Sequence, residues 1–235
     1  MNTKLIIAVD GANHSGKTTF VKLFERYSKA TKSFSLKPSK LVTNRNWWFY
    51  DSSPEEFIDE LLLLVKKRNE EVLSSHYRII LLDKGKKTLS ARIYATFKLR
   101  GYSEEILHKY IGLFEEKYDN IVMEDFSIYL ENEYYIKEED FLEKYNYIQR
   151  NILRMQSYDA CYIMKSPSDY PGLDFIEEIV VFFSKTSWNK VEKQSLKNIH
   201  RIITIKNFND DEINLIKQFL TKHGVNFFID NSYLH

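Results

Sequence analysis

The sequence has little of what a secreted or membrane-spanning protein needs. It holds one cysteine, Cys161, so no disulfide can form within the chain, and this fits a reducing compartment. No apolar stretch reaches the roughly 20 residues that cross a bilayer. The apolar run near the N-terminus is too short for the core of a secretion signal. We therefore expect a cytoplasmic protein that does not enter a membrane.

An excess of charge of one sign is also missing. Lysine and arginine number 34 against 33 aspartates and glutamates, which gives a formal net charge of +1 at pH 7. Proteins that bind nucleic acid or acidic lipid usually carry a strongly basic face. The short basic run KGKK, residues 84–87, is too small for such a face and suggests phosphate groups at a site. We expect no nucleic-acid partner and a small-molecule substrate.

Glycine and proline are scarce, with seven and four residues, and the chain has no flexible linker or low-complexity tract. Short apolar runs alternate with helical patterns, which predicts an α/β fold with a central parallel sheet and helices on both faces. The helix at 54–73 has a clear start signal, a serine followed by Pro54. The expected strands are 4–9, 33–40, 78–83, 126–130 and 160–165, and the expected helices are 17–29, 54–73, 88–100, 103–117, 138–157 and 173–185.

The chain after residue 185 has a further β-α-β pattern. A polar segment leads to the strand pattern HRIITIK (200–206), a helical pattern and a second strand pattern, VNFFID (225–230). We expect residues 1–185 to form the main domain and residues 186–235 to form a C-terminal β-α-β extension packed on that domain. The pattern fits either an extension of the sheet or a small lobe.

The clearest functional motif is GANHSGKT, residues 11–18, which fits G-x-x-x-x-G-K-[ST] at every constrained position and lies between a strand and a helix. In such a loop, backbone N–H groups surround phosphate oxygens at the positive end of the helix. Lys17 would place its charge at the β- and γ-phosphates, and Thr18 would bind Mg²⁺. The residues expected to bind ATP with Mg²⁺ are Gly11, Asn13, His14, Ser15, Gly16, Lys17, Thr18 and Thr19.

A second acid, Asp83, ends the apolar run IILLD, where proteins with such a loop have an acid near the metal. ATPases that hydrolyse their nucleotide usually have a glutamate next, to polarise water, but Lys84 follows here. This favours transfer of a phosphoryl group to a bound acceptor over hydrolysis. We expect Lys17, Asp83 and Lys84 to be catalytic, and Thr18 and Asp83 to bind the metal.

Three segments, in this order and spacing, resemble the thymidylate kinases, a family of P-loop nucleotide kinases. They are DGANHSGKTT (10–19), DKGKKTLSA (83–91) and EDFSIYLE (124–131). The resemblance covers about residues 4–185 and is strongest in the P-loop. It implies a three-layer P-loop kinase fold around a parallel sheet, ATP and Mg²⁺ as cofactors, a nucleoside monophosphate as the acceptor, and often a homodimer.

The resemblance also implies roles for single residues. Lys84 takes the place of an arginine that bridges the phosphates, and Lys37 falls beside the acceptor. Arg68 matches a helix arginine that grips the acceptor phosphate, which would explain a cation on the apolar face of its helix. Thr88 and Arg92 fall near the acceptor sugar and base. Departures from the family pattern lie mainly on the acceptor side, so the identity of the acceptor stays open.

Two other functions remain open. The segments WWFYDSSPEEF (47–57) and RIYATFKLRG (92–101) also resemble the deoxynucleoside kinases, in which Asp83 would act as a base toward a nucleoside 5′-hydroxyl. Alternatively, the chain is a nucleotide-binding regulatory module with a degenerate acceptor site. The segment expected to form the lid, 131–140, contains Lys137 but no arginine.

The paired tryptophans Trp47 and Trp48 have two interpretations. They could close over a nucleobase, or they could belong to a loop that plugs the edge of the core. We favour the second interpretation.

Overall fold

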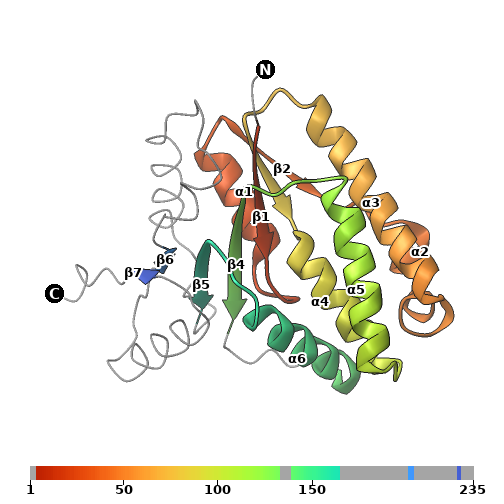
Figure 1. The fold of residues 1–235 in the computed structure, drawn as a ribbon. Helices are drawn as coiled ribbons and strands as arrows, with labels where there is room; N and C mark the ends of the chain where they lie inside the picture. The colour runs from red at the N-terminus through yellow and green to blue at the C-terminus, as the bar shows by residue number, and fades with distance from the viewer. Residues whose placement is uncertain (1–3, 133–138, 165–200, 204–226, 229–235) are drawn as a thin grey trace.

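The computed structural model describes residues 4–132, 139–164, 201–203 and 227–228. These residues form a parallel sheet with helices on both faces (Figure 1). The elements are β1 (Leu5–Asp10), α1 (Lys17–Tyr27), β2 (Thr31–Ser35), α2 (Lys40–Thr43), η1 (Trp47–Asp51), α3 (Pro54–Ser74), β3 (Ile79–Asp83), α4 (Lys86–Leu99), α5 (Glu104–Asp119), β4 (Phe126–Asn132), α6 (Asp140–Arg154), β5 (Ala160–Met164), β6 (Arg201–Ile203) and β7 (Phe227–Phe228).

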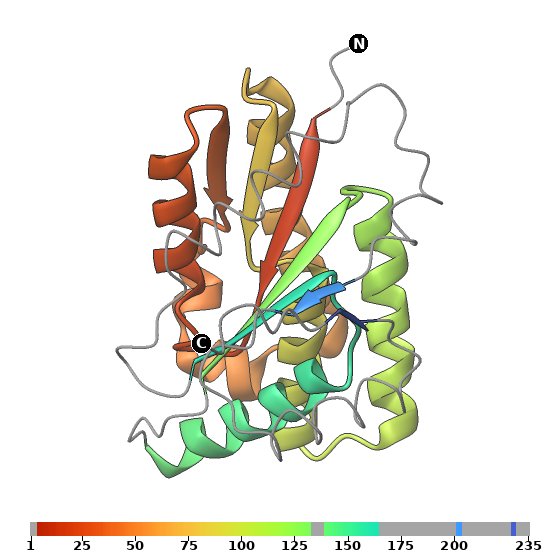
Figure 2. The same ribbon diagram turned by 90° about the vertical axis from the view of Figure 1, so that its left-hand side faces the viewer.

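The strands follow the order β2-β3-β1-β4-β5-β6-β7, and every neighbouring pair is parallel. The strands therefore end at the same edge of the sheet, as the side view in Figure 2 shows. Ile7 of β1 aligns with Leu81 of β3 on one side and with Phe126 of β4 on the other. This register brings Asp10 and Asp83, the last residues of β1 and β3, to the edge where the P-loop begins.

The alternation of side chains along the strands separates two cores. On one face, Phe20, Val21 and Phe24 of α1 pack against the odd-numbered residues of β1 and β3. On the other face, the even-numbered residues Ile80 and Leu82 pack with α3, α4 and α5. The strands are apolar on both faces because both faces are covered.

The predicted α/β architecture is confirmed, and the observed strands and helices lie within or close to the predicted ranges. The strand expected at 33–40 lies instead at Thr31–Ser35, and the short helix α2 follows it, capped by the Ser39 side chain, which accepts from Val42 N at 3.3 Å. The helix expected at 173–185, the helical part of the C-terminal extension and most of the expected lid lie outside the described residues.

The two strands expected in the C-terminal extension contain β6 and β7, which pair in parallel with the edge of the sheet beyond β5. The described strands of the extension thus extend the sheet. The domain boundary at residue 185 stays a prediction. Among the helices that the structure describes, none is both long and apolar enough to span a bilayer.

The predicted start of α3 is confirmed as a capping box. The Ser53 hydroxyl accepts from Glu56 N at 3.2 Å, and the Glu56 carboxylate accepts from Ser53 N at 2.9 Å. The loop before it contains the π-helical turn η1, in which Trp48 is buried against Phe57, with ring centroids 4.6 Å apart. Trp47 stacks on the same ring, with centroids 5.7 Å apart. Both tryptophans therefore pack at the edge of the core, in agreement with the favoured interpretation.

Arg100, at the end of α4, holds this turn in place. Its guanidinium donates to the carbonyl oxygens of Trp47, Trp48 and Ser52. It also lies 5.5 Å from the centroid of the Phe57 ring. The π-helical turn is thus fixed to α4, the helix that carries Arg92.

Candidate functional site

The P-loop has the backbone shape that its motif predicts. A Cβ atom on Gly11 would lie 2.3 Å from both the Leu130 carbonyl oxygen and the Ser15 Oγ, so only glycine fits there. His14 and Gly16 have φ angles of 61° and 74°, in the left-handed region. These angles turn the chain sharply between β1 and α1. The loop can therefore surround an anion at the start of α1.

Lys17 is the first residue of α1, and its side chain folds back over the loop. The ammonium donates to the Ala12 carbonyl oxygen and to Ser15 Oγ at 3.2 Å. Burial, followed by the positive charge of Arg92, lowers the pKa of Lys17 to about 7, although Asp83 acts in the opposite direction. An anion that binds beside Lys17 stabilises the charged form of its amine and so raises this pKa again.

Asp83 ends β3 opposite the start of α1 and is almost fully buried. Its Oδ2 accepts a hydrogen bond from the Thr18 hydroxyl at 2.8 Å and another from Ser35 Oγ at 3.3 Å. Its Oδ1 is buried and has no hydrogen-bond partner. A buried carboxylate oxygen without a partner, beside a hydroxyl, fits a hydrated Mg²⁺ ion, which prefers oxygen ligands. Thr18 and Asp83 are therefore suited to the metal role predicted for them.

Lys84 adopts a left-handed conformation, with φ 74°, directly after Asp83. The Arg68 side chain fixes this turn, because its Nη1 donates to the Lys84 carbonyl oxygen at 2.8 Å. The positive charge of Arg92, followed by burial, lowers the pKa of Lys84 to about 8. Lys84 is thus a second amine that would gain charge beside an anion.

Arg68 is buried and belongs to a chain of hydrogen bonds. Its Nη2 donates to the Tyr118 hydroxyl at 3.0 Å, and that hydroxyl donates to Glu124 Oε1 at 2.5 Å. The same carboxylate oxygen accepts from Lys86 N at 2.8 Å. Burial and the nearby Asp10 raise the pKa of Glu124. The cation on the apolar face of α3 is therefore paired with backbone carbonyls and a tyrosine, and its Nε alone is buried without a partner.

Asp10 connects the P-loop to α4. Its Oδ1 accepts from Gly85 N at 3.1 Å, from Thr88 N at 2.9 Å and from the Thr88 hydroxyl at 2.7 Å. The Thr88 hydroxyl in turn accepts from Gly11 N at 3.1 Å. Gly85 must be small, because a Cβ there would lie 2.5 Å from the Ala8 Cβ. The structure thus places Thr88 in the framework of the site, with partners inside the protein.

Asn13 connects the P-loop to α6 and α4. Its backbone N–H donates to Gln149 at 3.2 Å, and its side-chain amide donates to Asn146 at 2.9 Å. Its Oδ1 accepts from Arg92 Nη2 at 2.7 Å. The Arg92 guanidinium also lies 5.9 Å from the centroid of the Trp48 ring. The neutral side-chain amide of Asn13 therefore holds the Arg92 guanidinium at the P-loop.

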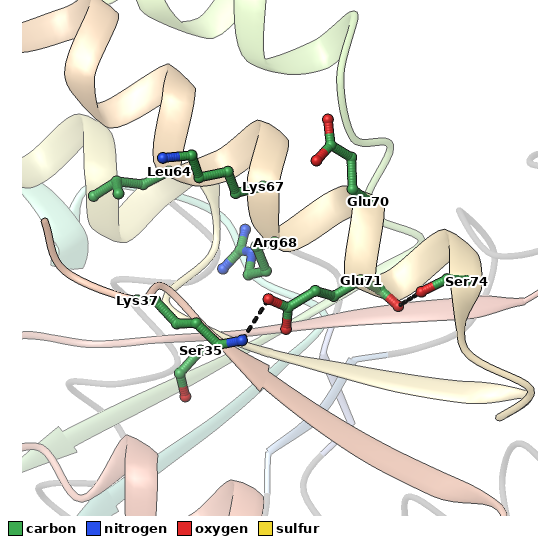
Figure 3. Close-up of a pocket in the computed structure, with 8 residues that line it drawn as sticks. All are labelled: Ser35, Lys37, Leu64, Lys67, Arg68, Glu70, Glu71 and Ser74. Atoms are coloured by element: carbon green, nitrogen blue, oxygen red, sulfur yellow. Dashed lines mark hydrogen bonds and ion pairs between the residues drawn. The ribbon is translucent and has the colours of Figure 1, made fainter.

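A cavity of about 380 Å³ lies between the end of β2 and α3 (Figure 3). Lys37 lies at this cavity and forms an ion pair with Glu71 at 2.5 Å. Ser35 and Arg68 join the cavity to the site, since Ser35 donates to the Asp83 carboxylate at 3.3 Å and Arg68 Nη1 lies 3.5 Å from the Asp83 carbonyl oxygen. The lining residues are Ser35, Lys37, Leu64, Lys67, Arg68, Glu70, Glu71 and Ser74.

Among the predicted site residues, the structure brings together Lys17, Thr18, Asp83, Lys84 and Arg92. Gly11, Asn13, Ser15 and Gly16 belong to the loop that joins β1 to this group, whereas His14 in the loop and Thr19 in α1 are exposed. Lys37 is separated from the group and lies at the cavity, which Arg68 also lines. The ligand contacts of all these residues stay predictions.

Six polar residues that support the site were not predicted from the sequence: Asp10, Ser35, Tyr118, Glu124, Asn146 and Gln149. Asp10 had a signal, because an acid directly after a buried strand lies at the edge where parallel strands end. Asn146 and Gln149 lie three positions apart on α6 and are buried, but their identity alone does not separate them from exposed polar residues. Glu124 begins the segment EDFSIYLE, but the resemblance gave it no role, and Tyr118 gave no signal in the sequence.

The sequence matches no protein-family model and no curated protein. Its fold is similar to that of solved structures. A thymidylate kinase from Candida albicans superposes with a TM-score of 0.58 at 11% identity, over 77% of this chain and 92% of that one. The NadR protein in complex with NAD and AMP-PNP gives a TM-score of 0.51 at 16% identity, over 80% of this chain and 51% of that one.

A thymidylate kinase from Ehrlichia chaffeensis gives a TM-score of 0.49 at 14% identity, over 78% of this chain and the whole of that one. At these identities the similarity concerns the fold. The chain has a thymidylate kinase-like P-loop kinase fold.

Proposed function

We propose that this protein transfers the γ-phosphoryl group of ATP to a nucleoside monophosphate. One observation carries the proposal. The Thr18 hydroxyl and the buried Asp83 carboxylate lie 2.8 Å apart beside the P-loop lysine, and one Asp83 oxygen is left without a partner. This combination suits a nucleoside triphosphate that arrives with a divalent cation.

On the donor side, the P-loop backbone would bind the phosphates, and the Lys17 ammonium would leave the Ala12 carbonyl oxygen for a phosphate oxygen. Thr18 and Asp83 would hold Mg²⁺, which when bound neutralises charge on the phosphate oxygens. Lys84 would add a second positive charge. The left-handed turn at Lys84 presents that residue beside Asp83, and Arg68 keeps the turn in place.

On the acceptor side, the cavity next to Asp83 is the candidate binding site. It is joined to the centre by Ser35 and Arg68, and Lys67 adds a cation to its wall. Lys67 forms no hydrogen bond or ion pair with another of the residues described. A monophosphate in this cavity would present a phosphate oxygen toward the bound ATP.

A second candidate is a nucleoside kinase that phosphorylates a 5′-hydroxyl. The contacts of Arg68 favour it, because both of its terminal nitrogens already donate to the Lys84 carbonyl oxygen and the Tyr118 hydroxyl. A nucleoside needs no cation to grip a phosphate. The unpaired Asp83 Oδ1 would then accept the proton of the hydroxyl as it attacks.

The direct test is phosphoryl transfer from MgATP to thymidine monophosphate, thymidine and the other common nucleosides and monophosphates. We expect transfer to one or more monophosphates, a loss of about a hundredfold or more in Lys17→Ala, and a similar loss in Asp83→Asn because the metal-side carboxylate is removed. ATP binding measured by calorimetry identifies variants that fail before the chemical step.

Each other outcome rejects a different part of this account. Transfer to unphosphorylated nucleosides alone would replace the first candidate by the second. ATP binding that depends on Lys17, with transfer to no acceptor, would reject both and leave the regulatory module. Unchanged turnover in Asp83→Asn would remove Asp83 from the catalytic residues.

Lys67 distinguishes the two acceptor classes better than Arg68 does, because Arg68 supports the Lys84 turn whichever acceptor binds. For a monophosphate acceptor, Lys67→Ala should raise the acceptor KM about fivefold to tenfold, through the loss of one partly exposed charge contact. The matched control is Lys66→Ala, since Lys66 is an exposed neighbour on α3 that does not line the cavity. Equal KM values in both variants would contradict an acceptor phosphate at this cavity.

The lowered pKa values predict proton uptake when MgATP binds. At pH 8 the free protein holds Lys17, with a pKa of about 7, largely neutral, and Lys84, with a pKa of about 8, partly neutral. Phosphates raise both pKa values, so binding at pH 8 should take up about one proton, and affinity should fall as the pH rises above about 7, the pKa of free Lys17. Calorimetry at pH 8 in two buffers of different ionisation enthalpy measures this uptake.

At pH 6 both lysines are already charged, so the uptake should disappear. Lys84→Met should reduce the uptake at pH 8 without removing it. Binding at pH 8 with no proton uptake would contradict a neutral resting lysine in the loop.

A further inference from the structure

Arg92 lies in the second turn of α4, and its position relative to the P-loop is tightly determined. The hydrogen bond of 2.7 Å to Asn13 fixes one terminal nitrogen, and the Trp48 ring lies against the guanidinium at 5.9 Å. Asn13 is itself oriented, because its amide nitrogen donates to Asn146 and leaves only the oxygen for Arg92. Trp48 is anchored in turn through its carbonyl, which accepts from Arg100.

The partners of Arg92 are neutral. In the described part of the chain no carboxylate forms an ion pair with it, and its Nε is buried without a hydrogen-bond partner. This differs from exposed cations such as Lys98 of the same helix, which pairs with Glu104. Arg92 therefore keeps an uncompensated positive charge and an unused donor at the site.

The positive charge of Arg92 lies near the two lysines of the site. It is close enough to Lys17 and to Lys84 to lower the pKa of each. Two acids lie near these cations: Asp83 acts on both lysines, and Asp10, whose Oδ1 is bonded to Thr88 and Gly85, acts on Lys17. Neither acid forms an ion pair with Arg92 in the described part of the chain. Like charges held together cost free energy, and a polyanion between them offsets that cost.

We propose that Arg92 is a catalytic residue that donates hydrogen bonds to the transferring phosphoryl group, rather than a contact for the acceptor sugar or base. The inference rests on the proposed function. In the transfer, the bond from the γ-phosphorus to the bridging oxygen of ADP breaks, and a bond to the acceptor oxygen forms. The guanidinium keeps its proton throughout and stabilises the charge on the phosphoryl oxygens, for which its planar fork is suited.

The sequence supports an arginine from α4 in this role. The segment 131–140, where the fold family places its lid, contains no arginine. An arginine that stabilises the transferred group can come from any element that reaches the phosphates. In this chain Arg92 is held at the P-loop before any ligand binds.

The test compares the binding of MgADP alone with the binding of MgADP plus aluminium fluoride, which mimics the transferring phosphoryl group. We expect Arg92→Ala and Arg92→Lys to weaken the aluminium fluoride complex at least about thirtyfold, because neither restores the fork, while the Kd for MgADP changes less than about threefold. Lys98→Ala, from the same helix, is the matched control and should behave as wild type. Equal effects on both ligands, or none on either, would overturn the proposal.

Kinetics give a second readout. With the acceptor identified in the transfer assay, the variants should lower kcat about a hundredfold and leave the acceptor KM unchanged. A raised acceptor KM with unchanged kcat would show instead that Arg92 contacts the acceptor, as the sequence resemblance implies. Arg92→Gln removes the charge and keeps a polar side chain, and the proposal requires it to be as impaired as Arg92→Ala.

The two proposals fail separately. If wild type transfers to no acceptor but forms an aluminium fluoride complex that depends on Arg92, the proposed function is wrong and the role of Arg92 stands. If wild type transfers phosphoryl groups and Arg92→Ala retains full kcat, the role of Arg92 is wrong and the function stands.

Discussion

The Asp10 carboxylate accepts three hydrogen bonds from the start of α4, two from Thr88 and one from Gly85, and the Thr88 hydroxyl accepts another from the first residue of the P-loop. This buried contact joins the loop after β1 to the turn after β3. Together with the pairing of β1 with β3 and the hydrogen bond from Thr18 to Asp83, it fixes the Lys17 side of the site relative to the Asp83 side. The Glu124 carboxylate, through Tyr118 and Arg68, extends the same frame to the Lys84 turn.

The charged side chains within this hydrogen-bonded frame do not balance one another without a ligand. Three cations, Lys17, Lys84 and Arg92, share the site with two acids, Asp10 and Asp83, each of which has one buried oxygen without a hydrogen-bond partner. The protein tolerates this arrangement by lowering the pKa values of the two lysines, at a cost that a bound polyanion with its metal ion would remove. The same imbalance supports both the proposed phosphoryl transfer and the role of Arg92, because a site built for a neutral ligand would not need it.

Local patterns predicted the parts of the molecule that depend on neighbours in the sequence. The strands, the capped start of α3 and the P-loop all follow from periodicity, a cap or a motif within about ten residues. The resemblance assigned Arg68 to the acceptor phosphate, but nothing in the sequence indicated its contacts with the Lys84 carbonyl oxygen and the Tyr118 hydroxyl. The contact of Asn13 with Gln149 joins residues 136 positions apart, and such contacts depend on how helices pack over the sheet. The acceptor side stays open for the same reason.

The central claim is that the sheet edge around Lys17 and Asp83 is a triphosphate site with a divalent cation. A crystal structure with a non-hydrolysable ATP analogue and Mg²⁺ tests it most directly. The account predicts phosphates enclosed by residues 11–18, the Lys17 amine moved from the Ala12 carbonyl oxygen to a phosphate oxygen, and the metal beside Thr18 and Asp83. A nucleotide bound elsewhere, or a Lys17 amine still on Ala12 beside a bound nucleotide, would contradict it.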